Sequence, residues 1–294
     1  MKRRVGLLLL AIGLVGCDTV VPGSEPVLVV EAFLQTDAPP PTIRLRQTGP
    51  LASPYDPDGA QAVTDASVIL RLDSLDIPYR ADPAAPGYYR PERTDLLLPP
   101  EAAFTLEIVW RGRLIRARDV LPPPIRIDSV QVSFPDAPVP AVLLDSLVLN
   151  DSLAIGARQG YLYPVEATLW WQAPDDPDST YWVRPHLQPA VPFSSVVVDL
   201  FLRTEQVLLE QQSPTDGNGR RRWTGVYAVP VDSARAPLPV HTLRVALLRS
   251  GRAYAQFAAT REFPERREPV SNVEGGLGIV AGIALDSLRL TVNP

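Results

Sequence analysis

The most suggestive spacing for chemistry lies near the C-terminus, where Gly276-Leu277-Gly278-Ile279-Val280-Ala281 has the form of a dinucleotide-binding fingerprint. That fingerprint works when a strand precedes the glycines and a helix follows them, so that the helix N-terminus meets a pyrophosphate. The residues that follow instead favour a last strand from Asp286 to Val292. We therefore interpret the glycines as positions of positive φ or close backbone approach in a packed loop, and we predict no bound cofactor.

Three acidic turns have residue types that suit a calcium site: Asp56-Pro57-Asp58-Gly59, Asp175-Asp176-Pro177-Asp178 and Asp216-Gly217-Asn218-Gly219. None of them completes the longer calcium-binding loop, which ends in a bidentate glutamate. Asp, Asn, Pro and Gly are also the residues that ordinary turns require. We therefore predict turns at these places and no metal site.

The residue types needed for common catalytic mechanisms are scarce. Cys17 is the only cysteine, Lys2 is the only lysine, and the two histidines are His186 and His241. Two histidines are too few for a three-histidine zinc site, and no lysine after Lys2 is present to form a Schiff base. The sequence also contains neither a glycine-flanked nucleophilic serine nor a His-Glu-x-x-His segment. A carboxylate pair of glycosidase type stays possible among 33 acidic residues, but the sequence nominates none. We predict that the protein is not an enzyme.

Two consecutive segments offer an aromatic surface instead. The runs from Val165 to Trp171 and from Tyr181 to His186 both alternate with a period of two, as half-buried strands do. If they pair as a hairpin through their apolar faces, Trp170 lies beside Trp182 on a polar face that also carries Arg184. Tryptophans among charges are typical of binding surfaces, so these three residues form a candidate binding surface. The alternative is that another strand, the helix or the first domain covers the tryptophans.

The N-terminus has the pattern of an export signal, since the positive cluster Met1-Lys2-Arg3-Arg4 precedes an uncharged apolar run that is too short to span a bilayer. Leu14-Val15-Gly16-Cys17 resembles the lipobox of bacterial lipoproteins. We expect a signal peptide over residues 1–16, lipid on Cys17 that anchors the chain to a membrane, and a tether over residues 17–26. Loss of the signal peptide makes the net charge about -8, which argues against a nucleic-acid partner.

Thirty-three prolines fall mostly between short runs rich in Val, Leu, Ile and Tyr, a pattern that predicts an all-β fold. The spacing of the first runs favours an immunoglobulin-like β-sandwich over residues 27–121. These runs are Val27 to Leu34, Thr42 to Gln47, Ser67 to Leu72, Phe104 to Trp110 and Leu114 to Val120. Leu121-Pro122-Pro123-Pro124 is predicted to be a stiff linker. A second, larger β-rich domain is predicted over residues 125–294, with one helix over residues 251–262 that Pro264 ends.

Three segments resemble a domain-of-unknown-function family of Bacteroidota outer-membrane lipoproteins, commonly found beside SusC-like TonB-dependent receptors. They are Val29-Val30-Glu31-Ala32-Phe33-Leu34, the run from Leu121 to Val130, and Val270-Ser271-Asn272-Val273-Glu274-Gly275-Gly276-Leu277-Gly278. The resemblance implies an amino-terminal immunoglobulin-like domain, a larger β-rich domain and an envelope role tied to uptake. It supplies no catalytic residues, and it gives the last segment a structural role at Asn272, Glu274, Gly275, Gly276 and Gly278. Ala32 departs from the glycine usual there.

Asp followed by Ser or Thr and an apolar residue recurs along the chain and resembles the O-glycosylation signal of exported Bacteroidota proteins. The serines in this pattern are Ser74, Ser129, Ser146, Ser152, Ser233 and Ser287. Hydroxyl groups at strand entrances tend to be exposed, which favours modification of at least one site. The alternative is that Asp-Ser ends a turn and the apolar residue opens a strand.

Together these patterns predict a non-enzymatic, lipid-anchored envelope protein at the outer membrane. The resemblance implies that it binds or presents ligands as an accessory of a TonB-dependent transporter. The alternative is a surface glycan-binding or adhesive module that works without a transporter.

Overall fold

The computed structural model describes residues 25–49, 61–73, 75–149, 152–173, 179–188, 196–198, 202–203, 211–214, 219–260 and 270–294. The fold is mostly β, with 61% strand and one short helix, and it consists of a large curled mixed sheet and a smaller antiparallel sheet. The prediction of an all-β fold is therefore confirmed. No helix in the described part of the chain is long and apolar enough to cross a membrane.

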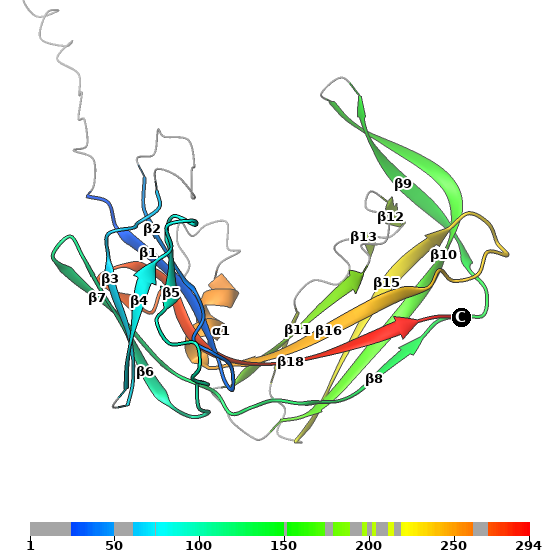
Figure 1. The fold of residues 1–294 in the computed structure, drawn as a ribbon. Coiled ribbons are helices and arrows are strands. Elements are labelled where there is room, and N and C mark those ends of the chain that lie inside the picture. The colour runs from blue at the N-terminus through cyan, green and yellow to red at the C-terminus, as the bar shows by residue number, and fades with distance from the viewer. Residues whose placement is uncertain are drawn as a thin grey trace, which may run out of the picture.

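The N-terminal strands form one curled stretch of the large sheet (Figure 1), in which five strands follow the predicted runs closely and two more, β4 and β5, were not predicted. They are β1 (Leu28–Gln35), β2 (Ile43–Gln47), β3 (Ser67–Leu72), β4 (Leu75–Ala81), β5 (Tyr88–Pro91), β6 (Ala103–Trp110) and β7 (Arg113–Val120). Their order in the sheet is β1-β2-β5-β4-β3-β6-β7, and all these pairs are antiparallel. Alternate side chains point inward, which is why each strand reads as apolar at every second residue.

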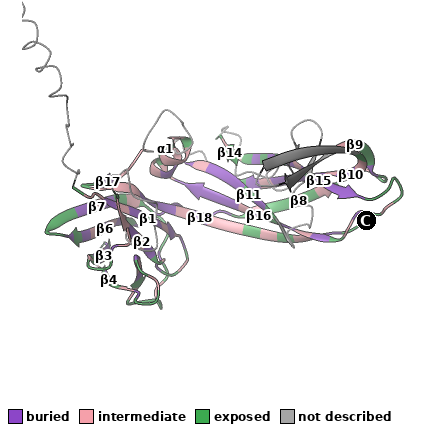
Figure 2. Ribbon diagram, turned by 90° about the horizontal axis from the view of Figure 1, so that it is seen from above, coloured by how far each residue is buried: buried purple, intermediate pink, exposed green. Residues whose placement is uncertain are grey.

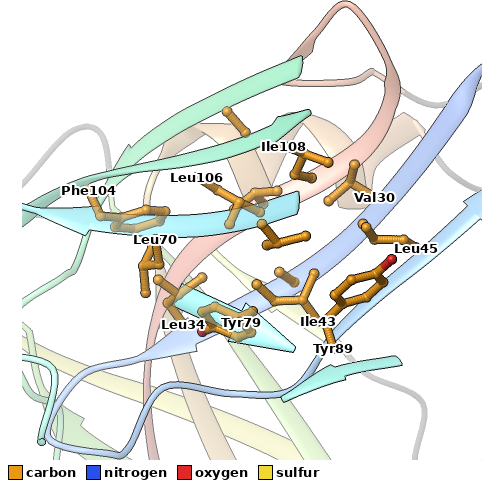
Figure 3. Close-up of a cluster of buried hydrophobic side chains, with 14 of the residues drawn as sticks. Val30, Leu34, Ile43, Leu45, Leu70, Tyr79, Tyr89, Phe104, Leu106 and Ile108 are labelled. Carbon is orange, nitrogen blue, oxygen red and sulfur yellow. The ribbon is translucent and has the colours of Figure 1, made fainter. Parts of the chain in front are cut away.

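Curling brings those inward side chains into one core, which Figure 3 shows between the strands. Five residues of this core are fully buried, with 0% of their surface exposed: Val30, Ile43, Leu45, Leu70 and Tyr89. Aromatic rings and branched side chains from opposite parts of the same sheet therefore meet. Each Å² of apolar surface that they remove from water contributes about 25 cal/mol to the free energy of folding.

The C-terminal strands close this N-terminal unit. β17 (Val273–Glu274) pairs with β7, and β18 (Leu277–Val292) pairs in parallel with β1 from Val29↔Leu277 to Gln35↔Ile283. Asn272 fixes the connection, because its side-chain amide donates to the Val280 carbonyl at 2.7 Å and accepts from the Val280 N–H at 3.0 Å. Val273 and Val280 are part of the N-terminal core. The core of the first half is thus completed by residues far away in sequence.

The second half consists of two packed layers. One layer continues the large sheet through β18, β16 (His241–Ser250), β11 (Thr180–Gln188) and β14 (Gln211–Ser213). The other is the smaller sheet, in the order β13-β12-β9-β10-β15, with β8 (Ile127–Ser133) also paired to β10. Its strands are β9 (Val139–Leu149), β10 (Ser152–Gln172), β12 (Val196–Val198), β13 (Leu202–Arg203) and β15 (Arg220–Val231). The rings of Trp171 on β10 and Tyr181 on β11 lie 5.9 Å apart between the layers.

The long strand β18 belongs to both halves (Figures 1 and 2). Its residues up to Ile283 pair with β1, and its residues from Ile283 onward pair with β16. The predicted linker after β7 is packed rather than extended into solvent, since Leu121 is 0% exposed and the Pro122 carbonyl accepts from the Thr36 hydroxyl at 2.7 Å. The division at residues 121–125 stays a prediction, and one continuous strand crosses between the two units.

The predicted helix is present as α1 (Arg252–Thr260). Tyr254 is its most buried residue, and its ring meets Trp182 at 4.8 Å and Phe33 at 5.6 Å, both edge-on. Edge-to-face contacts of this kind contribute about 0.5–1.5 kcal/mol beyond the area they bury. The helix is therefore held onto the outer side of the large sheet by aromatic packing.

Candidate functional site

The outward face of the smaller sheet carries a polar hollow of about 380 Å³, lined by side chains from three adjacent strands. Alternation along β10 explains its composition. Val165, Ala167, Leu169 and Trp171 point into the core and are each 0% exposed, so the residues between them point outward. The lining residues are Gln131 and Ser133 from β8, Glu166, Thr168 and Trp170 from β10, and Arg222 and Thr224 from β15. We call these residues the polar hollow.

The strand register places the polar hollow's side chains in rows across the three strands. Trp170 has Arg222 on one side and Ser129 on the other, while Thr168 lies between Thr224 and Gln131. The hydroxyl groups of Thr168 and Thr224 are hydrogen-bonded at 3.1 Å. Side chains directly opposite each other on neighbouring strands lie close enough to act on one ligand.

Its charged groups are exposed and available to a ligand. Glu166 and Arg222 are both exposed, and neither forms an ion pair with another described residue. Trp170 is half-buried, whereas the other four tryptophans are at most 6% exposed. The polar hollow therefore combines one accessible indole ring with an acceptor, a guanidinium donor and groups that do both.

The predicted partner of Trp170 lies elsewhere. The hairpin pairing is wrong, because β10 pairs with β15, β8 and β9, while β11 pairs with β14 and β16 in the other sheet. Trp182 is 4% exposed and packs beneath α1 against Tyr254. Arg184 donates to the Tyr254 hydroxyl at 3.0 Å and so belongs to that aromatic cluster. The alternative in which the helix covers a tryptophan holds for Trp182 only.

The apolar faces of the same two segments do meet. Trp171, Leu169, Tyr181 and Val183 are all buried in one core, but they face each other between two layers and not across one hairpin. The sequence alternation with a period of two correctly predicted the buried face of each strand. It carries no information on which strand becomes the neighbour, because that depends on residues distant in sequence.

The C-terminal glycines have the structural role that was expected of them. Gly275 has φ +78° and Gly278 has φ +109°, a backbone region that favours glycine. A Cβ at Gly278 would lie 2.0 Å from the carbonyl oxygen of Val30. Gly276 also lies close to the backbone of β1, although less closely, since a Cβ there would be 2.9 Å from the Leu28 carbonyl oxygen. Gly275 and Gly276 directly precede strand β18 and Gly278 lies inside it, where a dinucleotide site would need a helix. The last strand therefore begins at Leu277, nine residues before the predicted start at Asp286, and the predicted loop extends no further than Gly276.

Several other predicted sites lie partly or wholly outside the described residues. Outside the described residues lie Cys17, Ser74, the two turns at residues 56–59 and 175–178, and residues 216–218 of the third turn. Ser146 and Ser152 lie on β9 and β10, and only their backbones are described. Ser129, Ser233 and Ser287 are exposed. Within the described ranges, no three His, Cys, Asp or Glu side chains come together as a metal site would require.

The two histidines do not form a joint site. His186 is exposed on β11, while His241 is 4% exposed and lies edge-on to the Tyr227 ring. The His241 Nε2 atom is 2.6 Å from the Tyr227 hydroxyl, and its Nδ1 atom is 2.7 Å from the Pro239 carbonyl oxygen. Burial raises the pKa of the Tyr227 hydroxyl, so this hydroxyl stays neutral. The pair is a packed, hydrogen-bonded core contact.

Asp119 is the one carboxyl group with a pKa raised by burial among the described residues. It lies at the end of β7, where it accepts a hydrogen bond from the Gly282 N–H at 3.0 Å. That bond joins β7 to the middle of β18. Its role is therefore to connect the N-terminal strands with the strand that enters the second half.

A second hollow, of about 360 Å³, has the opposite character. Apolar side chains from β1, β18 and α1 line most of it, including Val29, Leu277, Ile279 and Phe257. Glu31 and Arg46 also line it, and they form an ion pair at 3.5 Å. Its charged groups are thus paired with each other, in contrast to those of the polar hollow.

Sequence reasoning found Trp170 but missed the neighbours that complete the polar hollow. Gln131 and Ser133 on β8 alternate with apolar residues just as Trp170 does, whereas on β15 Arg222 lies between Arg221 and Trp223, and Thr224 follows Trp223. The signal was therefore present in β8 and β10 separately. Only the register of three strands shows that these polar faces form one surface.

Comparison with known proteins identifies the family. The family model described as "Domain of unknown function (DUF4249)" matches residues 17–182. No curated protein and no solved structure matches this chain significantly. The match covers more than half of the 294 residues and includes the N-terminal strands, β8, β9 and β10, so the chain belongs to the DUF4249 family.

Proposed function

We propose that this protein is a lipid-anchored, non-enzymatic binding protein of the cell envelope that serves as an accessory of a TonB-dependent outer-membrane transporter. The observation that carries the binding role is the polar hollow, in which a half-buried tryptophan lies among exposed, unpaired charges. Concave sites with a few convergent polar groups are where ligands bind in most proteins. Membership of the family, together with the resemblance described above, supports the transporter as its partner.

The fold suits a protein that presents a ligand at a distance from its anchor. Lipid on Cys17 would hold the N-terminal strands near the outer membrane through a short tether. The polar hollow is lined by β8, β10 and β15, which lie in the other half of the molecule from β1–β7, with β18 running from one half to the other (Figure 1). Because β18 is hydrogen-bonded to strands of both halves, it fixes the polar hollow relative to the anchored unit.

The chemistry of the polar hollow favours binding over hydrolysis. Of the residues that line it, Glu166 is the only carboxylate. Glycoside hydrolysis requires a pair of carboxyl groups on either side of the scissile bond, one acting as acid and one as base or nucleophile. A single exposed carboxylate, together with a guanidinium and hydroxyl groups elsewhere in the same hollow, is suited to hydrogen bonding with a ligand.

The second candidate function is a surface glycan-binding or adhesive module that acts without a transporter. Trp170 favours it, because an accessible indole beside hydroxyl and amide groups is equally useful for adhesion. The two candidates share the binding site and differ in the partner. They are separated by asking whether a transporter is attached to the native protein.

The test is affinity purification of the native lipoprotein from its own membranes in mild detergent, followed by identification of the proteins that come with it. We expect a TonB-dependent outer-membrane transporter in amounts comparable to the tagged protein. The matched control is the Cys17→Ser variant, which lacks the anchor and should recover much less. Repeated recovery of no such transporter would contradict the accessory role and favour the module that acts alone.

A further inference from the structure

We propose that the polar hollow binds a neutral saccharide, with a sugar ring stacked on Trp170 and its hydroxyl groups hydrogen-bonded between Glu166 and Arg222. This inference rests on the proposed binding role and names the ligand class for that site. It does not depend on the transporter. The chemistry of the lining, its charge balance and its size each support it.

The lining of the polar hollow matches a ligand with many hydroxyl groups. Arg222 only donates hydrogen bonds, Glu166 only accepts them, and Gln131 does both. The hydroxyl groups of Ser133, Thr168 and Thr224 also do both. A sugar hydroxyl is itself a donor and an acceptor, so it can satisfy each of these groups in turn. No aliphatic side chain lines the polar hollow, which leaves an apolar peptide anchor or an acyl chain without a complementary surface.

Its charges disfavour the other common polar ligands. Glu166 and Arg222 are the two charged groups of the polar hollow, and they are of opposite sign. One carboxylate and one guanidinium leave the lining of the polar hollow without a net positive charge that would attract a phosphorylated ligand or a polyanion. A neutral ligand instead gains charge-assisted hydrogen bonds from both groups, which are stronger than those between neutral partners.

The position of Trp170 supplies the apolar component. Its strand neighbours across the ladder are Arg222 and Ser129, so polar groups flank the indole on both sides. The faces of sugar rings carry C–H groups that pack on an aromatic face, while their equatorial hydroxyl groups reach outward to the flanking side chains. A volume of about 380 Å³ lies within the range of small-ligand sites and suits a mono- or disaccharide unit.

Fluorescence provides a direct readout, because Trp170 is the one tryptophan that solvent reaches well. Trp110, Trp171, Trp182 and Trp223 are at most 6% exposed. Acrylamide should therefore quench mainly the emission of Trp170. A sugar that stacks on this ring should protect it, and the Trp170→Phe variant should lose the quenchable component while keeping an aromatic platform.

The experiment titrates the full-length mature protein in mild detergent with neutral gluco-, manno-, xylo- and galacto-oligosaccharides, measuring acrylamide quenching and calorimetric affinity. We expect at least one of them to bind and to protect Trp170. Trp170→Ala should weaken that binding about tenfold or more, and Trp170→Phe should weaken it less. Arg222→Gln should also weaken it, whereas Arg244→Gln, at an exposed arginine on β16 outside the hollow, should not.

The saccharide assignment is overturned if no member of the panel binds, if Trp170→Ala binds as well as the unchanged protein, or if inorganic phosphate alone protects Trp170. Circular dichroism of each variant establishes that it is folded before binding is compared. Recovery of a transporter without saccharide binding would overturn this inference and leave the accessory role intact. Saccharide binding without a transporter would do the reverse.

Discussion

Replacing Gly278 with alanine should destabilise the whole protein far more than an alanine substitution at an ordinary glycine. Gly278 has φ +109°, and a Cβ there would lie 2.0 Å from the Val30 carbonyl oxygen and 2.9 Å from its carbonyl carbon. Both atoms are backbone, in a strand that is paired on one side with β18 and on the other with β2. Val30 therefore cannot move away without breaking ladder hydrogen bonds.

Gly112 provides the matched control. It also has a positive φ, of +73°, but no atom lies within 4 Å of a Cβ built on it. Gly112→Ala should therefore cost only the backbone strain of an L-residue in this region, about 1–2 kcal/mol. Gly278→Ala carries a larger strain, because φ +109° lies outside the left-handed region open to L-residues, and it adds the collision with Val30, so we expect a total loss of about 4 kcal/mol or more.

The assay is urea denaturation of both variants and the unchanged protein, followed by circular dichroism and analysed for the free energy of unfolding. Both changes add the same methyl group, so the difference between the two alanine variants measures the collision with Val30 together with the larger backbone strain at φ +109°. A Gly278→Ala variant no less stable than Gly112→Ala would refute the close parallel pairing of β1 with β18. It would also remove the structural explanation of the C-terminal glycines.

Three further predictions concern the anchor, the tryptophans and the junction between the halves. Cys17→Ser should release a folded protein from the membrane fraction, and retention through a high-salt wash would show a different anchor. Trp182→Ala should cost about 3–5 kcal/mol of unfolding free energy, since it leaves a cavity beneath α1, while Trp170→Ala should shift Tm little. Equal losses in thermal denaturation would contradict this contrast. Burial raises the pKa of the Asp119 carboxyl, so the folded chain holds a proton that the unfolded chain releases, and stability should fall as the pH rises above the ordinary carboxyl range. Asp119→Asn keeps an acceptor for Gly282 and should flatten this slope in urea midpoints measured from about pH 4 to 7, and an unchanged slope would assign it to another group.

Local patterns predicted the local structure well. The runs in the N-terminal half correspond to β1, β2, β3, β6 and β7 within a residue or two, and the helical spacing around Tyr254 corresponds to α1. Both signals depend on residues close in sequence. Side chains at every second or every third and fourth position share a face whatever the rest of the chain does.

The partners of those elements could not be predicted in the same way. β1 pairs in parallel with β18, almost at the other end of the chain, and β10 lies in a different sheet from β11 although they are neighbours in sequence. Alternation fixes which face of a strand is buried, but many strands compete for each edge. The predicted pairing of Trp170 with Trp182 was wrong for this reason, because the prediction assumed that consecutive strands pair.

The candidate site was therefore half predictable. Trp170 was correctly assigned to the outward face of its strand, and the register then gave it Arg222 and Ser129 as neighbours in place of Trp182. The C-terminal glycines were more informative, because few residue types other than glycine allow the backbone approach at Gly278. A glycine that the backbone geometry requires can be recognised in a single sequence, whereas a polar surface formed by three different strands cannot.

The most direct test of the proposed function is photocrosslinking in living cells, with a photoreactive amino acid placed at Arg220, an exposed residue on β15 two positions from the polar hollow's Arg222. The control places it at Leu97, which is 57% exposed in the N-terminal half. If the polar hollow presents its ligand to a TonB-dependent transporter, position 220 should give a covalent adduct with that transporter, and position 97 should give much less. Adducts with the transporter at neither position, in cells where the protein is folded and membrane-bound, would contradict the proposal.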